Sequence, residues 1–204
     1  MRVSRVALVV ALLVVGHDVS AQQRGGGGRG GGRGGGRGGA AVMTLTSAAF
    51  ANAAQIPVKY SQAGEEVSPP LAWSGGPDTV ASFVLLVHDP NAPAAGGVDD
   101  VLHWLVWNIP GSARSLAEGI PHGPQASDGM RQISASGPYY RGPAAPPTGP
   151  VHNYVFELFA LDTLIDVAPV GATPAATRAA VLTAMTGHVR GKGALVGWFR
   201  RSAP

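Results

Sequence analysis

The polar residues of this sequence that are best placed to do chemistry lie at the ends of apolar runs. Asp89 ends one run, and His103 lies near the start of the next. His152 opens a third run, with Tyr154 two positions later, so both side chains would point to the same face of a strand. A carboxylate can orient an imidazole, and two imidazoles and a phenol can donate hydrogen bonds to a small ligand.

Spacing alone leaves three interpretations of these side chains open. They converge on one small concave site, or two histidines and the aspartate hold a metal ion, or each is a separate polar group that is satisfied at its own strand end. The sequence has no cysteine, and no two histidines have the i, i+4 spacing of a helical metal motif. We therefore expect no metal and no cofactor.

The stretch from Arg141 to Asp162 would position two of these residues. Its first half contains four prolines and two glycines, so it cannot form a helix or a central strand. Its second half, 151–161, is aromatic and β-branched, which is typical of a buried strand. A stiff loop that leads into a strand beginning His-x-Tyr predicts the wall of a pocket.

Other apolar runs predict the remaining elements. Strands are predicted over 42–46, 56–60, 71–73, 81–88, 101–109 and 194–200. The strand over 81–88 should end at Asp89-Pro90, because proline interrupts a ladder, and 111–141 predicts a long loop. Thr173-Pro174 is typical of a helix start, so a helix is predicted over 175–186, with Gly187 as its cap.

The order of these elements predicts the fold class. Six to eight strands and one clear helix, without strand–helix alternation, favour an antiparallel β-sandwich with a peripheral helix over a doubly wound α/β fold. In the 101–109 strand, simple alternation places His103, Leu105 and Trp107 on one face.

The first 39 residues differ in composition from the rest. Residues 1–21 have a basic start, an apolar run and small residues before Ala21, which is the pattern of a secretory signal peptide. Residues 22–39 are rich in glycine and arginine and predict a disordered linker. We expect cleavage near Ala21, export to the periplasm or outside the cell, and a single domain over 40–204.

Charge and motifs argue against several function classes. The formal net charge is +3, but removing the leader and the four linker arginines leaves a domain near −2. Nucleic acid is therefore not an expected partner of the domain. The Gly/Arg tract resembles an RNA-binding tail, but on an exported protein it is better explained as a solvated tether. The sequence contains no Gly-x-Ser-x-Gly elbow and no Gly-x-x-x-x-Gly-Lys loop.

Several sequence blocks, taken together and in order, resemble one known family. They are SPPLAW over 68–73, DPNAP over 89–93, HW leading to NIP over 103–110, GPxxPPxG leading to HNY over 142–154, and GHV over 187–189. This pattern is similar to the phosphatidylethanolamine-binding protein family and, within it, to the bacterial branch called Raf kinase inhibitor-like. The resemblance covers residues 40–201.

The resemblance implies a β-sandwich of antiparallel Greek-key strands, one or two peripheral α-helices, and an anion pocket at one end. The pocket residues that it implies are Asp89, His103, Gly142, Pro143, His152 and Tyr154. Backbone N–H groups, the tyrosine hydroxyl and the imidazoles can all donate to a phosphate or phospholipid head group. Asp89 can orient an imidazole or meet an ammonium group. Protonated histidines favour anions, so affinity should fall as pH rises.

We therefore expect an exported, non-enzymatic protein that binds a small anion and has no catalytic residue, with regulation of a partner protein left open. The alternative is a secreted hydrolase inhibitor, or a hydrolase with His103 or His152 as base, although no nucleophile stands out. The sequence does not indicate a kinase partner. The expectation of a homodimer rests on the resemblance alone.

Two residues depart from the family's motifs. Asn91 stands where the family commonly has Asp, and Asn153 stands where it commonly has Arg. Loss of an acid and of a base suggests compensating changes in one ion pair beside the pocket.

Overall fold

The computed structural model describes residues 39–94, 97 and 99–203. The predicted signal peptide over 1–21 lies outside the described residues, as does the predicted linker over 22–39 except for Gly39. In the part that is described, no helix is long and apolar enough to cross a lipid bilayer.

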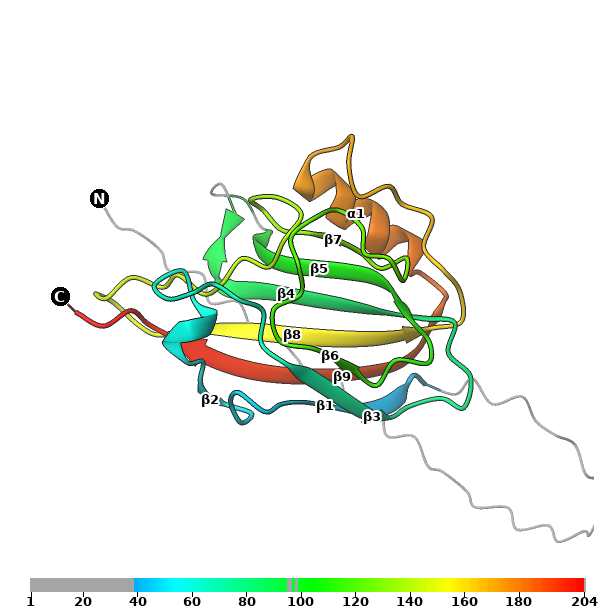
Figure 1. The fold of residues 1–204 in the computed structure, drawn as a ribbon, viewed down its shortest axis with the longest axis horizontal. Helices are drawn as coiled ribbons and strands as arrows, with labels where there is room; N and C mark the ends of the chain where they lie inside the picture. Colours follow the sequence, from blue (N-terminus) through cyan, green and yellow to red (C-terminus); the bar gives the residue numbers. More distant parts are fainter. Residues whose placement is uncertain (1–38, 95–96, 98, 204) are drawn as a thin grey trace, which may run out of the picture. The chain divides into compact units, whose positions relative to one another are not determined.

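Nine strands, a single α-helix and one 3-10 turn make up the described chain (Figure 1). The strands are β1 Ala41–Ser47, β2 Ala54–Gln55, β3 Leu71–Gly75, β4 Ser82–Pro93, β5 Asp100–Pro110, β6 Ser115–Leu116, β7 Arg131–Ile133, β8 His152–Leu161 and β9 Val189–Phe199. The helix α1 is Pro174–Ala184, and the turn η1 is Val58–Tyr60. The predicted class, a β-dominated fold with a peripheral helix, is confirmed.

The strands form one curled sheet with the order β6-β3-β1-β9-β8-β4-β5-β7, and β2 pairs with β9 beside this path. In Figure 1, β3 and β6 pass in front of β9 and β8, so the sheet folds back over its own centre. β9 pairs in parallel with β1 and β2, whereas the other pairings are antiparallel as expected.

Glycines on β9 let the folded-over strands approach closely. A Cβ at Gly193 would lie 2.7 Å from the carbonyl oxygen of Met43 in β1, and a Cβ at Gly197 would lie 2.5 Å from Ile56 Cγ1. Side chains at these positions would push β1 and the segment after β2 away from the sheet.

Two apolar cores lie on opposite faces of the long strands. The inner core is enclosed by the folded-back sheet and includes Leu45, Trp73, Phe83, Leu85, Trp104, Val106, Phe156 and Leu158. The outer core lies under α1 and includes Val84, Leu86, Leu105, Trp107, Val181 and Met185. Successive residues of β4 therefore alternate between the two cores, which explains why its sequence is continuously apolar.

The helix begins where the sequence predicted. The Thr173 hydroxyl accepts a hydrogen bond from the N–H of Ala176 at 3.2 Å, and Pro174 occupies the first turn. The α-helix ends at Ala184, two residues before the predicted end at Thr186, and Gly187 follows with φ of +83°. Thr177 and Val181 are buried and hold the helix on the outer core.

Several strand predictions were wrong in extent. β9 begins at Val189, five residues before the predicted start at 194, and β6 and β7 lie in the segment 111–141 that was predicted as a loop. The predicted strand over 56–60 is replaced by β2 and η1, because Pro57 cannot donate to a ladder and its carbonyl accepts the N–H of Tyr60 instead. β4 does not stop at Asp89-Pro90 but continues to Pro93. Its pairing with β8 ends at His88, so the prolines lie where β4 has only one neighbour.

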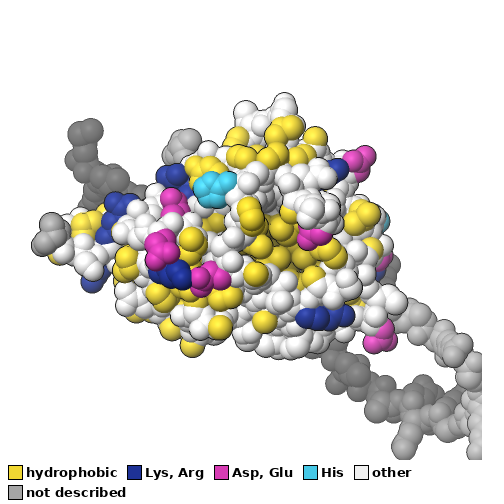
Figure 2. Space-filling model, in the orientation of Figure 1, with side chains coloured by type: hydrophobic (Ala, Val, Ile, Leu, Met, Phe, Trp, Pro, Cys, Tyr) yellow, Lys and Arg dark blue, Asp and Glu magenta, His cyan; other side chains and the backbone are white. Residues whose placement is uncertain are grey.

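Acidic and basic side chains occur in small mixed groups on the face shown in Figure 2, with apolar side chains between them. Among the described residues, this face therefore presents no continuous basic surface of the kind that binds nucleic acid.

Candidate functional site

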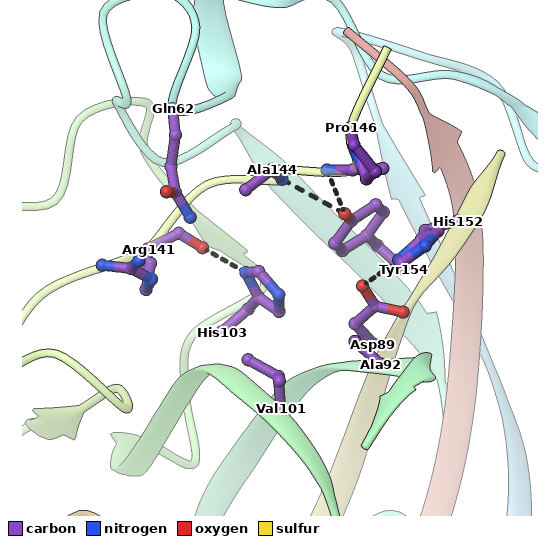
Figure 3. Close-up of a pocket in the computed structure, with 11 residues that line it drawn as sticks. Gln62, Asp89, Ala92, Val101, His103, Arg141, Ala144, Pro146, His152 and Tyr154 are labelled. Atoms are coloured by element: carbon purple, nitrogen blue, oxygen red, sulfur yellow. Dashed lines mark hydrogen bonds and ion pairs between the residues drawn. The ribbon is translucent and has the colours of Figure 1, made fainter. Parts of the chain in front are cut away.

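A cavity of about 160 Å³ lies between the proline loop and strands β4, β5 and β8 (Figure 3). It is lined by Gln62, Asp89, Ala92, Val101, His103, Arg141, Ala144, Ala145, Pro146, His152 and Tyr154. The structure thus brings Asp89, His103, His152 and Tyr154 to one place. Gly142 and Pro143, also expected at the site, are not among the lining residues, although their neighbours on both sides are.

A β-bulge aims His103 at this cavity. Along the β4–β5 ladder, Val87 pairs with Trp104 but the next residue, His88, pairs with Leu102, so His103 is an extra residue in β5. Its ring packs edge-on against Tyr154 of the inner core, with the ring centres 5.0 Å apart. The expectation that His103 shares a face with Leu105 and Trp107 was therefore wrong, because the bulge breaks the alternation.

The protein fixes the tautomer of His103. Nδ1 lies 2.8 Å from the carbonyl oxygen of Arg141, which can only accept, so Nδ1 carries the proton. The other nitrogen, Nε2, is on the opposite side of the ring from this bond (Figure 3). Burial lowers the pKa of His103, opposed in part by the Arg141 carbonyl and the Asp89 charge. The neutral ring therefore offers Nε2 as an acceptor at neutral pH.

Asp89 orients His152 from a buried position. Its Oδ2 lies 2.8 Å from His152 Nδ1, and its Oδ1 accepts the N–H of Asn91 at 2.9 Å. Asp89 is 2% exposed, so both oxygens need these partners. Of the two roles considered for Asp89, the geometry favours orienting an imidazole over meeting a ligand ammonium group.

Tyr154 is held by the proline loop. Its hydroxyl oxygen accepts the N–H groups of Ala144 and Ala145, each at 3.2 Å. Burial, with a smaller contribution from the Asp89 charge, raises the pKa of Tyr154 to about 12. The hydroxyl is therefore protonated at neutral pH, and its own proton is left to donate to Asp89 or to a ligand.

Gly142 and Pro143 dock the loop onto the rest of the protein. The N–H of Gly142 donates to Glu66 at 3.2 Å, and its carbonyl accepts from the Gln62 side chain at 2.7 Å. A Cβ at Gly142 would lie 2.5 Å from the Tyr60 carbonyl oxygen, so only glycine fits. The backbone donors at Gly142, Ala144 and Ala145 thus hold the loop and Tyr154 in place rather than standing free for a ligand.

A hydrogen bond joins Asn91 and Asn153 beside the site, and it uses the side chain of Asn91 and the backbone of Asn153. The Asn91 side-chain oxygen accepts the N–H of Asn153 at 2.8 Å. An aspartate at position 91 would offer the same acceptor, so this contact does not depend on the ion pair that the two departures suggested.

Sequence reasoning missed Gln62 and Arg141 as lining residues. Arg141 directly precedes the Gly-Pro motif, and that adjacency was the one available signal. Gln62 follows η1, a turn that the sequence did not predict, and no motif includes it. Within the described ranges, no three His, Asp or Glu side chains form a group that could hold a metal ion.

The fold and this cavity define a β-dominated protein with a small pocket, lined by both polar and apolar side chains, at the end of its long strands. Comparison with known proteins gives the family. The family model described as phosphatidylethanolamine-binding protein matches residues 46–200. The chain therefore belongs to the phosphatidylethanolamine-binding protein family.

Individual relatives agree with this assignment. A UPF0098 protein of Methanothermobacter thermautotrophicus is 41% identical over 161 residues, which cover 78% of this chain and 99% of the relative. The crystal structure of CT736, a homologue from Chlamydia trachomatis, has a TM-score of 0.66 and 32% identity and covers 79% of this chain and 99% of that one. Escherichia coli YbcL, at 22% identity, has a TM-score of 0.64 over 78% of this chain and 99% of its own, and shows the shared fold.

Proposed function

We propose that this protein is a non-enzymatic member of its family that binds a small phosphate- or carboxylate-type anion in the cavity. The observation that carries the proposal is the convergence of Asp89, His103, His152 and Tyr154 on one cavity. Each of the two imidazoles has one ring nitrogen bonded to the protein, at Arg141 and at Asp89 respectively. Each second nitrogen has no hydrogen-bond partner among the described residues and is available to a ligand.

The size of the cavity supports a head group rather than a whole lipid. Its volume is about 160 Å³, against about 30 Å³ for one water in the liquid. A phosphate group fits this space, and acyl chains would remain outside.

Thermal unfolding with added anions tests the proposal. Inorganic phosphate or phosphoethanolamine should raise the melting temperature, because a ligand at 100 times its Kd stabilises by about 2.7 kcal/mol. His103→Ala should remove this shift. His188→Ala is the control, since His188 bonds Asp162 at 2.8 Å away from the cavity. The proposal is wrong if no anion shifts the wild type, or if the His103 variant responds like the wild type.

We further propose that the protein is exported and that its Gly/Arg tract acts as a tether. The signal-like pattern of residues 1–21 supports this. Cell fractionation and N-terminal sequencing of the mature chain test it. A mature protein that begins near Gln22 in the periplasm or medium is the expected result, and an intact Met1 in the cytosol contradicts it.

A further inference from the structure

Five charged side chains form a network on the outer face of the sheet, outside the cavity described above. They are His88 in β4, Asp100 in β5, Glu157 in β8, Arg178 in α1 and Lys192 in β9. We propose that His88 is a proton-dependent clamp between two ion pairs of this network. With both ring nitrogens protonated it joins the two pairs, and as a neutral ring it can hold only one of them.

Strand alternation places His88 on the outer face. Val84 and Leu86 of β4 belong to the outer core, and His88 follows them at the next alternate position. β9, β8, β4 and β5 lie next to one another in that order (Figure 1). Across the ladder between β4 and β8, Glu157 pairs with Leu86 and is therefore a diagonal neighbour of His88 on the same face. The sheet itself thus holds the histidine beside a carboxylate.

The imidazole of His88 lies between two carboxylates. Its Nδ1 bonds Asp100 Oδ2, and its Nε2 lies 3.5 Å from Glu157 Oε2. A carboxylate oxygen can only accept, so both contacts are favourable only when both ring nitrogens carry a proton. The His88 side chain is 15% exposed, so water cannot readily replace a lost partner. A neutral ring would direct a lone pair at one of the carboxylates.

Each carboxylate also has a basic partner on a different element. Arg178 Nη1 lies 2.6 Å from Asp100 Oδ1 and donates to the Asp100 carbonyl at 3.0 Å. Lys192 Nζ lies 2.6 Å from Glu157 Oε1. His88 therefore stands between a pair that links α1 to β5 and a pair that links β9 to β8.

Two further carboxylates adjoin this network in the sequence. Asp89 follows His88 but lies on the inner side, where it bonds His152 at 2.8 Å. Asp99 precedes Asp100 and is exposed. Neither forms an ion pair with His88 in the described part of the chain. The protonation of His88 is therefore governed by the two carboxylates that it contacts.

These two carboxylates favour the charged ring. The bond with Glu157 raises the pKa of His88 above 6.5, burial opposes this shift, and the bond with Asp100 adds to it. A raised pKa means that the clamp stabilises the fold fully below about pH 6.5 and loses this effect as pH rises through the pKa of the folded protein. Glu157, whose pKa is lowered, contributes fully only above about pH 4.5. The clamp therefore contributes most between about pH 4.5 and about pH 6.5.

Nitrogen NMR of the imidazole rings tests the clamp directly, with the His88 signals assigned by their loss in His88→Gln. We expect both ring nitrogens of His88 to carry protons at about pH 6.5, where an unperturbed histidine is half protonated. Asp100→Asn and Glu157→Gln should each lower the pH at which His88 loses its second proton. If this midpoint lies at or below about pH 6.5 in the wild type, or if only one of the two variants lowers it, His88 does not join the two pairs.

Stability across pH gives an independent readout by urea unfolding. In His88→Gln the amide can donate to one carboxylate but cannot take up a proton, so this variant imitates the open clamp. The unfolding equilibrium constant of the variant should exceed that of the wild type most near about pH 6. Above about pH 6.5 this ratio should fall by up to about tenfold per pH unit, because the wild type loses its advantage.

The control is His122→Gln, since His122 is exposed and stacks on Tyr139 rather than facing a carboxylate. Its ratio to the wild type should change little with pH. A ratio for His88→Gln that stays constant from about pH 6 to about pH 9 overturns the proposal. Neither readout needs a ligand, so failure of the clamp and failure of anion binding are separate results.

Discussion

His103 and Arg141 are bonded to each other through both backbone and side chain. The Arg141 N–H donates to the His103 carbonyl at 2.9 Å, and the His103 ring donates to the Arg141 carbonyl at 2.8 Å. Residue 103 is the bulge residue of β5, and residue 141 begins the proline loop. The loop is thus joined to the sheet at the point where the sheet aims a side chain into the cavity. A substitution that shifts the loop should therefore also shift the bulge residue of the sheet, and the reverse should hold.

Asp89→Asn tests the buried carboxylate. The change removes a charge-assisted bond to His152 at 2.8 Å from a residue that is 2% exposed. We expect a loss of about 1–3 kcal/mol in unfolding free energy and a smaller phosphate-induced shift. Urea unfolding with unchanged m-value measures the first, and thermal unfolding with phosphate measures the second.

Asp162→Asn is the control for that change. Asp162 bonds His188 at the same 2.8 Å, but its side chain is 37% exposed. The Asp162 variant should lose less unfolding free energy than the Asp89 variant, because solvent screens the exposed contacts of Asp162 with His188 and Arg190. Equal losses of unfolding free energy in the two variants would show that burial does not strengthen the interaction between Asp89 and His152.

Gly142→Ala tests the docking of the loop. The added Cβ would lie 2.5 Å from the Tyr60 carbonyl oxygen and 2.8 Å from Ser61 Cα, both backbone atoms that cannot turn aside. We expect a loss of about 1–3 kcal/mol in unfolding free energy and weaker anion binding, because the loop also holds Tyr154 and His103. Gly39→Ala, where no atom lies within 4 Å, is the control. A fully stable variant would mean that the loop shifts without cost.

Gln132→Leu tests a buried polar network under the long loop. The Gln132 side chain accepts from the Trp104 indole at 2.8 Å and donates to the carbonyls of Pro121 at 2.7 Å and Gly123 at 2.9 Å. The change leaves three groups unpaired, so we expect a loss of at least about 2 kcal/mol. Hydrogen exchange over 120–131 should also speed up. Gln125→Leu at an exposed position is the control, and unchanged exchange in the Gln132 variant would contradict the prediction.

Glu157→Gln tests an ion network on the outer face. Glu157 contacts His88 at 3.5 Å and Lys192 at 2.6 Å. The bond with His88 lowers the pKa of Glu157 from 4.5 to about 2. Burial opposes this shift, and Lys192 adds to it. A lowered pKa means that the carboxylate stabilises the fold above about pH 4.5 and loses this effect as pH falls toward 2.

The variant should therefore be less stable than the wild type at neutral pH, and the two unfolding free energies should converge near pH 2. Urea unfolding across this range measures the difference. Glu65→Gln, at an exposed position, should show little difference at any pH. If the difference in unfolding free energy between the wild type and the Glu157 variant stays constant down to pH 2, the pKa of Glu157 is not lowered in the folded protein.

The elements that were predicted from sequence have strong local signals. β8 lies within the predicted 151–161 because that run is aromatic and β-branched, and α1 begins at Thr173-Pro174 because both capping signals are local. Motif blocks indicated Asp89, His103, His152 and Tyr154, which the structure places together. In these cases the information needed lies within a few residues of the feature.

What the sequence did not reveal depends on partners that are distant along the chain. The direction of His103 follows from a mismatch in length between β4 and β5, and no pattern within β5 alone shows it. The parallel pairing of β1 with β9 joins the two ends of the domain. The loop N–H groups were expected to face a ligand, but their acceptors, Glu66 and Tyr154, become visible only in three dimensions.

The bulge at His103 frees one side chain of β5 from the pairing pattern of the sheet. The ladder closes around this residue, from Trp104 to Leu102, so its side chain has no partner position on β4 to match. A substitution there changes what the cavity offers while the neighbouring strand pairs keep their register. The sheet can therefore accommodate another side chain at position 103 without a change of strand register, at the cost of the side-chain bond to Arg141.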